Sequence, residues 1–405
     1  MRDIARPLAS PLFRRLWLGQ TVSYSGDAAY AVALALYLLP RPDAPHAIGL
    51  TLGATAFGGV MTLLLGGALA DRYRRSRVIV ASDLMRAAAV AGLVIGGPHA
   101  PLWFLGALAV VQGVGSGLHR PAYGAVLRST VPRDVLSHAN ALRTVSTRLA
   151  AVLGAALGGV LADATTPRWV LAGDVATFGV SMVTLLGFGD GPPQGASEKK
   201  DSLWADITDG LAYVLRRPWM VAVMAQGTAQ LALVAAPVAL LLPLLTGGGH
   251  WYGWIVAAEA AGAFGGASLG AALRTRSPGW LAMAALLAQL PQTVTLALDA
   301  PAWSVLLCSA LTGAGLSVFA VVWTTALQTG VEHSRLGRVF AVDAVAATVL
   351  SPFGYVISGW LLAAMGKPTY LAWFAAGALS LSVLVVLPVP GLRHLANQDE
   401  EMARG

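Results

Sequence analysis

The sequence predicts an all-α integral membrane protein with twelve transmembrane helices, arranged as two six-helix pseudo-repeats. The composition is the first observation behind this prediction. Of the 405 residues, 56% are apolar and only 12% are charged, whereas a soluble domain carries about 25% charged residues. Long apolar runs along the chain and a weak internal repeat are the other two observations. Together they exclude a soluble enzyme, a disordered chain and a coiled coil.

Twelve apolar runs are each long enough to cross about 30 Å of hydrocarbon at 1.5 Å per residue. We expect helices, because lipid offers no hydrogen-bond partner to an exposed backbone and barrel strands are only about 10 residues long. The predicted spans cover residues 14–39, 47–70, 78–97, 101–127, 137–162, 168–188, 219–245, 251–272, 279–298, 302–327, 338–363 and 369–390.

The basic residues predict the orientation of these spans. Twenty of the 27 Lys and Arg residues fall at the termini or in alternate loops on one side, and only Arg41, Arg168 and Lys367 fall on the other. The positive-inside rule therefore places both termini in the cytoplasm. The ratio of 24 Arg to 3 Lys suggests a bacterial source and hence a bacterial inner membrane. Because the net charge of +7 reflects this asymmetry, we expect the lipid bilayer and no nucleic acid as a partner.

A polar, Pro- and Gly-rich connection divides the spans six plus six. We expect an N-terminal bundle over residues 1–190, a cytoplasmic linker with an amphipathic helix over 191–218, a C-terminal bundle over 219–392 and a cytoplasmic tail over 393–405. At an offset of 200 residues, 13 of the 64 pairs that start from residues 100–163 are identical. Duplicated helical bundles are typical of transporters whose site opens to alternate sides.

One loop carries the sharpest local motif. Residues 67–77 read Gly-Ala-Leu-Ala-Asp-Arg-Tyr-Arg-Arg-Ser-Arg, which resembles the major facilitator superfamily signature G-x-L-a-D-r-x-G-r-r with Arg74 in place of the second glycine. Segments 13–20, 120–122, 139–142 and 337–340, together with Gly26-Asp27, are similar to the macrolide-efflux and enterobactin-exporter branch of that superfamily. The resemblance covers nearly the whole chain and implies the major facilitator fold and drug–proton antiport.

The resemblance also implies a gate on the cytoplasmic side. In that family the aspartate matched by Asp71 helps to hold this side closed, by engaging positive groups and the N-terminus of the eleventh span. A helix N-terminus favours a carboxylate by about 0.3–1 kcal/mol. The alternative is that the basic run after Asp71 only anchors the topology. The candidate gating residues of this group are Asp71, Arg72, Arg75, Arg128 and Arg338.

Two further signatures of the superfamily are degraded. Ala109 stands where the fourth span of the family carries an arginine tied to proton coupling, and Ala155 replaces the proline of the antiporter signature in the fifth span. Both changes weaken the antiporter assignment and keep an importer or uniporter open as alternatives. We expect the glycines spaced by four in these and other spans to pack helices closely. They are Gly113 and Gly117, Gly154 and Gly158, and Gly262, Gly266 and Gly270.

Charges inside the membrane cost a few kcal/mol each unless they are paired or line a cavity. Asp27 lies about 20 Å along its helix at 1.5 Å per residue, with Tyr24 and Tyr30 close to its face. Glu259 lies at a similar depth in the eighth span. Such a carboxylate can exchange a proton for a cationic substrate. The alternative for Asp27 is a structural carboxylate paired with Arg148 or with a backbone group.

The remaining intramembrane charges lie nearer the helix ends. We expect them to form gate salt bridges or helix anchors: Asp83, Arg86, Arg120, Arg143 and Asp343. Asp174 lies near the outer end of its span, where a solvated rim explains a carboxylate. His119 is the only His within a span and is predicted to be a packing residue.

Polar and aromatic groups that could line a cavity are few, which suits a bulky amphipathic compound better than a sugar. They are Tyr123, Gln226, Gln230, Gln289, Gln292 and Trp323. No catalytic, nucleotide-binding or metal motif occurs, and the single Cys308 is expected to be a small buried residue. We therefore expect no cofactor and no metal, and transport driven by an ion gradient or by the solute gradient.

The sequence thus predicts a monomeric efflux transporter that exports small amphipathic compounds. Antibiotic-like or siderophore-like molecules, a multidrug range and a role in antibiotic resistance are the expectation, with proton antiport and alternating access as the mechanism. The proton-coupling and substrate residues are predicted to be Asp27, Glu259, Tyr24, Tyr30, Tyr123, Gln226 and Trp323. The alternatives are an importer or uniporter of a polar nutrient and a non-transporting membrane scaffold.

Overall fold

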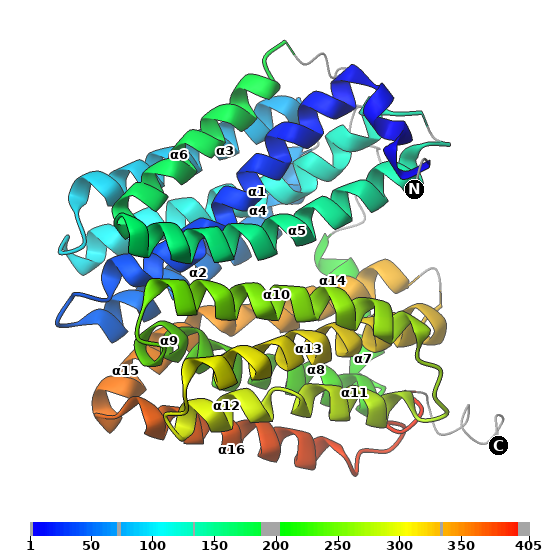
Figure 1. The fold of residues 1–405 in the computed structure, drawn as a ribbon. Helices are drawn as coiled ribbons and strands as arrows, with labels where there is room; N and C mark the ends of the chain where they lie inside the picture. Colours follow the sequence, from blue (N-terminus) through cyan, green and yellow to red (C-terminus); the bar gives the residue numbers. More distant parts are fainter. Residues whose placement is uncertain (1–2, 71–73, 133, 188–202, 333–334, 396–405) are drawn as a thin grey trace. The chain divides into compact units, whose positions relative to one another are not determined.

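The computed structural model describes residues 3–70, 74–132, 134–187, 203–332 and 335–395 (Figure 1). These residues form helices and short connections, with no strand among them. The chain divides into two compact units, Met1–Ser197 with Gly247–Ala257 and Glu198–Thr246 with Ala258–Gly405. The predicted all-α class is confirmed. The predicted four-part division stays a prediction, because much of the linker and the tail lies outside the described residues.

The first unit contains six long helices that coincide with the first six predicted spans. Their bounds are α1 Pro11–Leu38, α2 Ala44–Ala70, α3 Arg75–Gly96, α4 Leu102–Thr130, α5 Leu136–Ala164 and α6 Pro167–Thr184, after the short 3-10 helix η1 Asp3–Ala9. Helix α1 packs against α5 and α6, α3 packs against α4 and α6, and α2 packs against α4. Helices α1 and α3 therefore both pack against α6, so side chains from all three helices can meet inside this unit.

Local signals set the start of α1 and the turn that follows it. Ser10 accepts a hydrogen bond from the backbone N–H of Phe13 and precedes Pro11, which suits the first helical position. After α1, Arg41 forms an ion pair with Asp43 at 2.7 Å and donates to two backbone carbonyls after α3. The guanidinium holds the pKa of the Asp43 carboxyl below its usual range. Arg41, one of the three basic residues predicted to lie on the side opposite to the cytoplasm, therefore has a structural role.

Glycine packing in the first unit follows the prediction. A side chain at Gly113 of α4 would collide with the backbone of Thr55 in α2, and one at Gly117 would lie 2.6 Å from the Cβ of Thr62. Small residues thus let the two backbones approach closely. Gly154 of α5 likewise faces α1, where a side chain would meet the backbone of residue 25. The same holds for Gly262 and Gly266 in the second unit, which lie against residues 310 and 314.

Eleven helical segments form the rest of the described chain. They are α7 Leu203–Leu215, α8 Pro218–Gln230, the π-helix η2 Leu231–Ala235, α9 Ala236–Leu245, α10 Gly249–Ala272, α11 Pro278–Leu287, α12 Leu290–Ala297, α13 Ala302–Gly330, α14 Leu336–Val349, α15 Ser351–Met365 and α16 Pro368–Val386. Helix α7 lies within residues 191–218, where a linker with an amphipathic helix is predicted. Its Tyr213 and Val214 are buried in the core of the second unit, and α7 packs against α14.

Three predicted continuous spans are interrupted in the structure. The span over 279–298 breaks between α11 and α12, and the span over 338–363 breaks at Leu350 between α14 and α15. Pro291 and Pro352 follow these breaks and cannot donate the backbone hydrogen bond that a continuous helix needs. The π-helix η2 precedes Pro237 in the same way. Each of these stretches is still one apolar span, and proline accounts for the interruption within it.

Within the described ranges, nine helices or helix pairs are long and apolar enough to cross a membrane. The C-terminus of helix α15, at Met365, is followed by Gly366. This glycine has a φ of 73° and caps the helix in the left-handed conformation. The twelve predicted spans each coincide with a helix or an interrupted helix of the structure.

Candidate functional site

A buried ion pair joins the first and third spans. The carboxylate of Asp27 in α1 contacts the Nη2 atom of Arg86 in α3. The Arg86 side chain is only 4% exposed, whereas Asp27 is 28% exposed. The guanidinium also lies 3.7 Å from Asp83 Oδ1 and 4.3 Å from the centre of the Phe178 ring. Arg86 therefore sits between one carboxylate that is partly accessible and one that is sealed.

Arg148, one of the partners that the structural alternative gave to Asp27, was wrong. Arg148 is exposed, and the structure pairs Asp27 with Arg86 instead. Helix α3 has no extensive packing with α1, but the long side chain of Arg86 spans the distance. Asp83, predicted as a gate or anchor, is fully buried in the same cluster.

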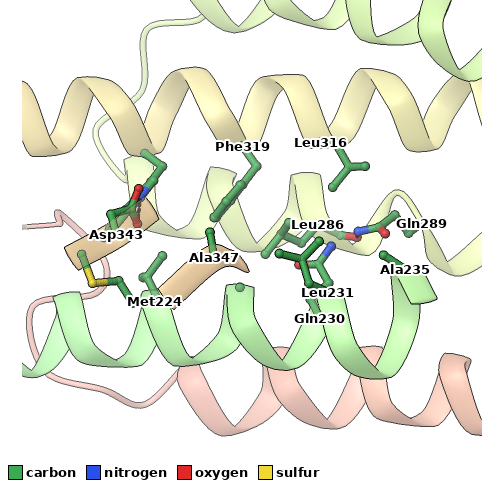
Figure 2. A pocket seen from close by; sticks show the side chains of 13 residues that line it. Met224, Gln230, Leu231, Ala235, Leu286, Gln289, Leu316, Phe319, Asp343 and Ala347 are labelled. Carbon is green, nitrogen blue, oxygen red and sulfur yellow. Dashed lines mark hydrogen bonds between the residues drawn. The ribbon is translucent and has the colours of Figure 1, made fainter. Parts of the chain in front are cut away.

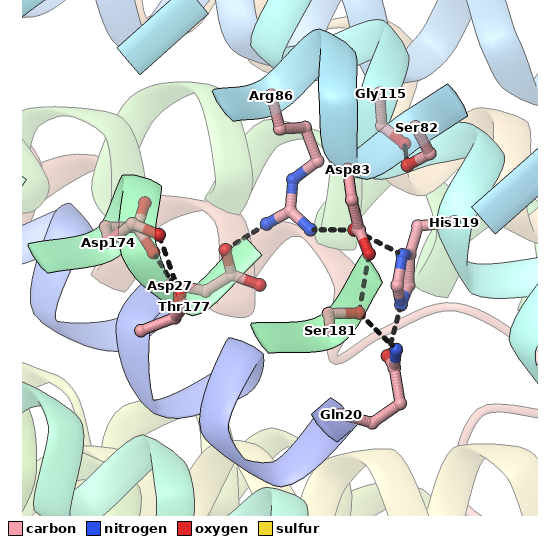
Figure 3. Close-up of polar contacts among 10 residues, drawn as sticks. All are labelled: Gln20, Asp27, Ser82, Asp83, Arg86, Gly115, His119, Asp174, Thr177 and Ser181. Atoms are coloured by element: carbon pink, nitrogen blue, oxygen red, sulfur yellow. Dashed lines mark hydrogen bonds and ion pairs between the residues drawn. The ribbon is translucent and has the colours of Figure 1, made fainter. Parts of the chain in front are cut away.

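Four side chains from four helices form a closed ring beside this pair (Figure 3). Gln20 Nε2 in α1 donates to Ser181 Oγ in α6 at 2.8 Å, and Ser181 Oγ donates to Asp83 Oδ2 in α3 at 2.6 Å. His119 Nε2 in α4 lies 2.6 Å from Gln20 Oε1, and its Nδ1 lies 3.2 Å from Asp83 Oδ1. The prediction that His119 only packs was wrong, because both of its ring nitrogens face polar atoms.

Asp174 lies next to this cluster rather than at a solvated rim. It is 2% exposed, and its Oδ1 accepts a hydrogen bond from Thr177 at 3.2 Å. Gly26 of α1 packs directly against the carboxylate, because a side chain there would collide with Oδ1. Figure 3 shows Asp174 beside Asp27. The rim interpretation was wrong because α6 turns this face toward α1, not toward solvent.

Aromatic rings cover one side of the cluster. Tyr24 lies edge-on to both His119 and Tyr123, with ring centres 6.2 Å and 6.1 Å apart. Tyr123 stacks with His119, and Arg143 lies over its ring at 4.7 Å. Tyr30 is buried, and its hydroxyl makes no hydrogen bond within the described part of the chain. The structure thus brings Tyr24 and Tyr123 to the cluster beside Asp27.

The second unit contains a cavity of about 250 Å³ between α8, η2, α11, α13 and α14. Figure 2 shows Gln230 and Gln289 at one end and Asp343 at the other. Trp323, also in the lining, donates from Nε1 to Asp343 Oδ1 at 3.0 Å. The rest of the lining is almost entirely apolar, from Leu, Val, Met, Phe, Ala and Gly side chains. Three of the predicted cavity residues therefore line this cavity.

Other predicted residues of the second unit lie elsewhere. Gln226 bonds to Gln230 at 3.4 Å and borders a separate apolar groove of about 650 Å³ with Trp373. Gln292 donates to Ser309 at 2.6 Å. Glu259 is half-buried and makes no hydrogen bond or ion pair with any described residue. The structure does not bring Glu259 into the cavity lining.

The predicted gating residues are only partly described. Asp71 and Arg72, and the side chains of Arg120 and Arg128, lie outside the described residues. Arg75 begins α3. Arg338, at the start of α14, pairs with Asp209 of α7 at 2.6 Å. Arg143 and Asp343 belong to different units, and each has a partner within its own unit.

Gln20 and Ser181 belong to the cluster but were not among the residues predicted from the sequence. A signal for both was present, because Gln20 precedes Asp27 by seven residues and Asp174 precedes Ser181 by seven. Residues seven apart lie on one face of a helix. Gln20 with Asp27, and Asp174 with Ser181, each form a polar stripe on one face of an apolar span. Two such stripes indicate that these faces of α1 and α6 point into the protein and not into lipid.

The comparisons with known proteins identify the class. Residues 16–251 match the family model of the Major Facilitator Superfamily, which is more than half of the chain, so the chain belongs to this family. It is therefore a multi-pass membrane transporter of small molecules and not an enzyme. The family predicted from the motifs and the all-α membrane fold are confirmed.

Individual relatives narrow the comparison. The chain is 26% identical to the enterobactin exporter EntS of Escherichia coli (strain K12) over 397 residues, which cover 95% of this chain and 93% of the relative. The EntS of Escherichia coli (strain SMS-3-5 / SECEC) is 25% identical over 405 residues, 97% of this chain and 95% of that one.

Two solved structures share the fold. The nucleoside transporter NupG superposes with a TM-score of 0.76 at 11% identity, covering 93% of this chain and 98% of that one. A bacterial homologue of the iron transporter ferroportin has a TM-score of 0.68 at 17% identity, covering 93% of this chain and 98% of that one.

Proposed function

We propose that this transporter exports a small amphipathic compound from the cell in exchange for protons, by alternating access, as a monomer with both termini in the cytoplasm. The observation that carries the proposal is the ion pair of Asp27 and Arg86. Its carboxylate is 28% exposed while its guanidinium is 4% exposed. A carboxylate that is accessible on one side and held by a buried cation on the other can accept either a proton or a cationic group.

The chemistry of the cavity supports an amphipathic substrate. Ligand pockets span about 300–1,000 Å³ and use a small number of polar groups to orient the ligand. The cavity of about 250 Å³ in the second unit offers two glutamines and Asp343 in an apolar lining. A sugar needs many more hydrogen-bond partners, so this lining favours a compound with a large apolar surface.

The relatives support the direction of transport. The similarity to the enterobactin exporters covers 95% of the chain without a missing bundle. A siderophore-like compound is therefore within the proposed substrate class, together with antibiotic-like molecules, and we propose a multidrug range.

The experiment uses the full chain reconstituted into liposomes with an acidic lumen. Ethidium, a fluorescent amphipathic cation, and enterobactin are the two probes. We expect either probe to accumulate in the lumen while the proton gradient persists, and we expect Asp27→Asn to abolish this gradient dependence. Asp43→Asn is the matched control, because it neutralises a carboxylate in the turn after α1, and it should transport normally.

Three outcomes contradict the proposal. Accumulation that ignores the gradient rules out proton exchange. Movement of uridine or D-xylose down its own gradient, with neither probe transported, favours an importer or uniporter of a polar nutrient. No movement of any solute, with Asp27→Asn identical to the original chain, favours a membrane scaffold.

A further inference from the structure

The ring of Gln20, Ser181, Asp83 and His119 has a definite proton requirement. It contains four polar contacts, at 2.8, 2.6, 2.6 and 3.2 Å. Each contact between a donor and an acceptor needs one hydrogen atom between the two heavy atoms. The number of hydrogens that the four side chains supply therefore decides whether the ring can close (Figure 3).

When Asp83 is ionised and His119 is neutral, the four side chains supply three hydrogen atoms for the four contacts, which is one too few. The Ser181 hydroxyl has one hydrogen. Gln20 points its amide nitrogen at one neighbour and its oxygen at the other, so it adds one donor to the ring. A neutral imidazole has one N–H. Reversing the Gln20 amide or changing the imidazole tautomer moves the deficit to another contact but does not remove it.

The observed geometry places the deficit between His119 Nδ1 and Asp83 Oδ1. Since Gln20 Oε1 can only accept, the facing Nε2 must carry the N–H, which leaves Nδ1 without one in a neutral ring. Neither Nδ1 nor Oδ1 has a hydrogen-bond partner within the described residues. His119 is 3% exposed and Asp83 is fully buried. Without a further proton, two buried lone pairs would face each other at 3.2 Å.

We propose that this ring is a proton-binding site, with one proton held between His119 Nδ1 and Asp83 Oδ1. The proton completes the fourth hydrogen bond and neutralises the charge of Asp83 locally. Its loss opens the ring and leaves Asp83 ionised, 3.7 Å from the Nη1 of Arg86. Asp83 then competes with Asp27 for the same guanidinium. The ring therefore links its proton to the accessible carboxylate through Arg86.

The surroundings contain further charged and titratable groups that act on this site. From the elements packed around the ring, they are Tyr24 and Asp27 on α1, Arg86 on α3, Tyr123 on α4, Arg143 on α5 and Asp174 on α6.

Two variants change the hydrogen count in opposite ways. Asp83→Asn adds an amide donor, so the ring closes with four hydrogens and needs no extra proton. His119→Gln supplies one donor, as a neutral imidazole does, but cannot take up a second. We expect Asp83→Asn to keep the ring closed at every pH and His119→Gln to keep it short of one hydrogen.

The direct test is solid-state NMR of the full chain in lipid bilayers, with ¹⁵N-labelled histidine. The chain has seven His residues, and the signals of His119 are those lost in His119→Gln. His99→Gln, in the exposed connection after α3, is the matched control. At neutral pH we expect either an imidazolium at His119 or an infrared carboxylic acid band that disappears in Asp83→Asn. In Asp83→Asn we expect a neutral His119 at the same pH, because the ring then needs no extra proton.

A neutral His119 in the original chain at neutral pH, together with no infrared band that depends on Asp83, overturns the proposal. This result needs no variant to fold and no substrate. The role in transport rests on the proposed function, whereas the proton site does not. If His119 and Asp83 hold the proton but ethidium and enterobactin ignore the pH gradient, the proton site stands and proton antiport fails. If the gradient drives transport but His119 and Asp83 hold no proton, antiport stands and this site fails.

Discussion

Replacement of Arg86 by methionine tests whether the buried charge cluster is held together as the structure indicates. The variant keeps an unbranched apolar stem but leaves Asp27 and the fully buried Asp83 without their shared cation. Removing one partner of a buried ion pair typically costs 3–5 kcal/mol. The variant also loses the contact of the guanidinium with the Phe178 ring, whose centre lies 4.3 Å away, and this contribution is included in the same free energy. We therefore expect Arg86→Met to lower the free energy of unfolding by about 3–5 kcal/mol.

The assay is unfolding of the purified chain in mixed micelles by a denaturing detergent, followed by tryptophan fluorescence. The double variant Asp27→Asn with Arg86→Met should recover part of the lost free energy, because one of the two orphaned carboxylates is gone while the fully buried Asp83 remains. Arg75→Met is the matched control on the same helix, and we expect it to stay within about 0.5 kcal/mol of the original chain. A loss below about 1 kcal/mol for Arg86→Met, or no recovery in the double variant, would refute the reasoning.

Three other predictions use the same unfolding and liposome assays. Gly113→Ala should destabilise by about 1–3 kcal/mol because its Cβ meets the backbone of α2, whereas Gly59→Ala, with open space around it, should be neutral or stabilising; equal effects would contradict the close packing. Trp323→Phe removes the N–H donor to the cavity carboxylate and should cost about 1.5–3 kcal/mol and slow ethidium accumulation, so an unchanged rate would remove this cavity from the transport path. Arg338→Gln breaks an ion pair with Asp209 whose side chains are 36% and 42% exposed, and should cost less than about 1 kcal/mol; a larger loss would show that the pair is effectively buried.

The fold could be predicted from the sequence because lipid leaves few choices. An apolar run of about 20 residues must satisfy its backbone internally, so run length predicts helix position. The breaks could not be placed the same way. Proline is tolerated in many membrane helices, and only the tertiary structure decides whether the chain continues past Pro243 or breaks before Pro291.

The site could be predicted in part, for a related reason. Asp27, Asp83 and Arg86 stand out because a charge in a span needs a partner. The sequence does not reveal which partner, because that depends on how each helix is rotated and which helices are neighbours. The structural alternative for Asp27 therefore named Arg148 or a backbone group and not Arg86. Gln20 and Ser181 gave no signal by residue type, since uncharged polar residues are common in helix interfaces.

The positions of two carboxylates around one guanidinium set the sign of the proposed coupling. A cationic substrate that engages the accessible Asp27 would release Arg86, which then lies within reach of Asp83 at 3.7 Å. A cation beside Asp83 favours its ionised form, so the ring proton would leave. Coupling between two sites is reciprocal, so a proton that enters the ring would return Arg86 to Asp27 and expel the substrate. Substrate and proton would thus exclude each other. Proton antiport requires this mutual exclusion, whereas cotransport requires both to be bound together.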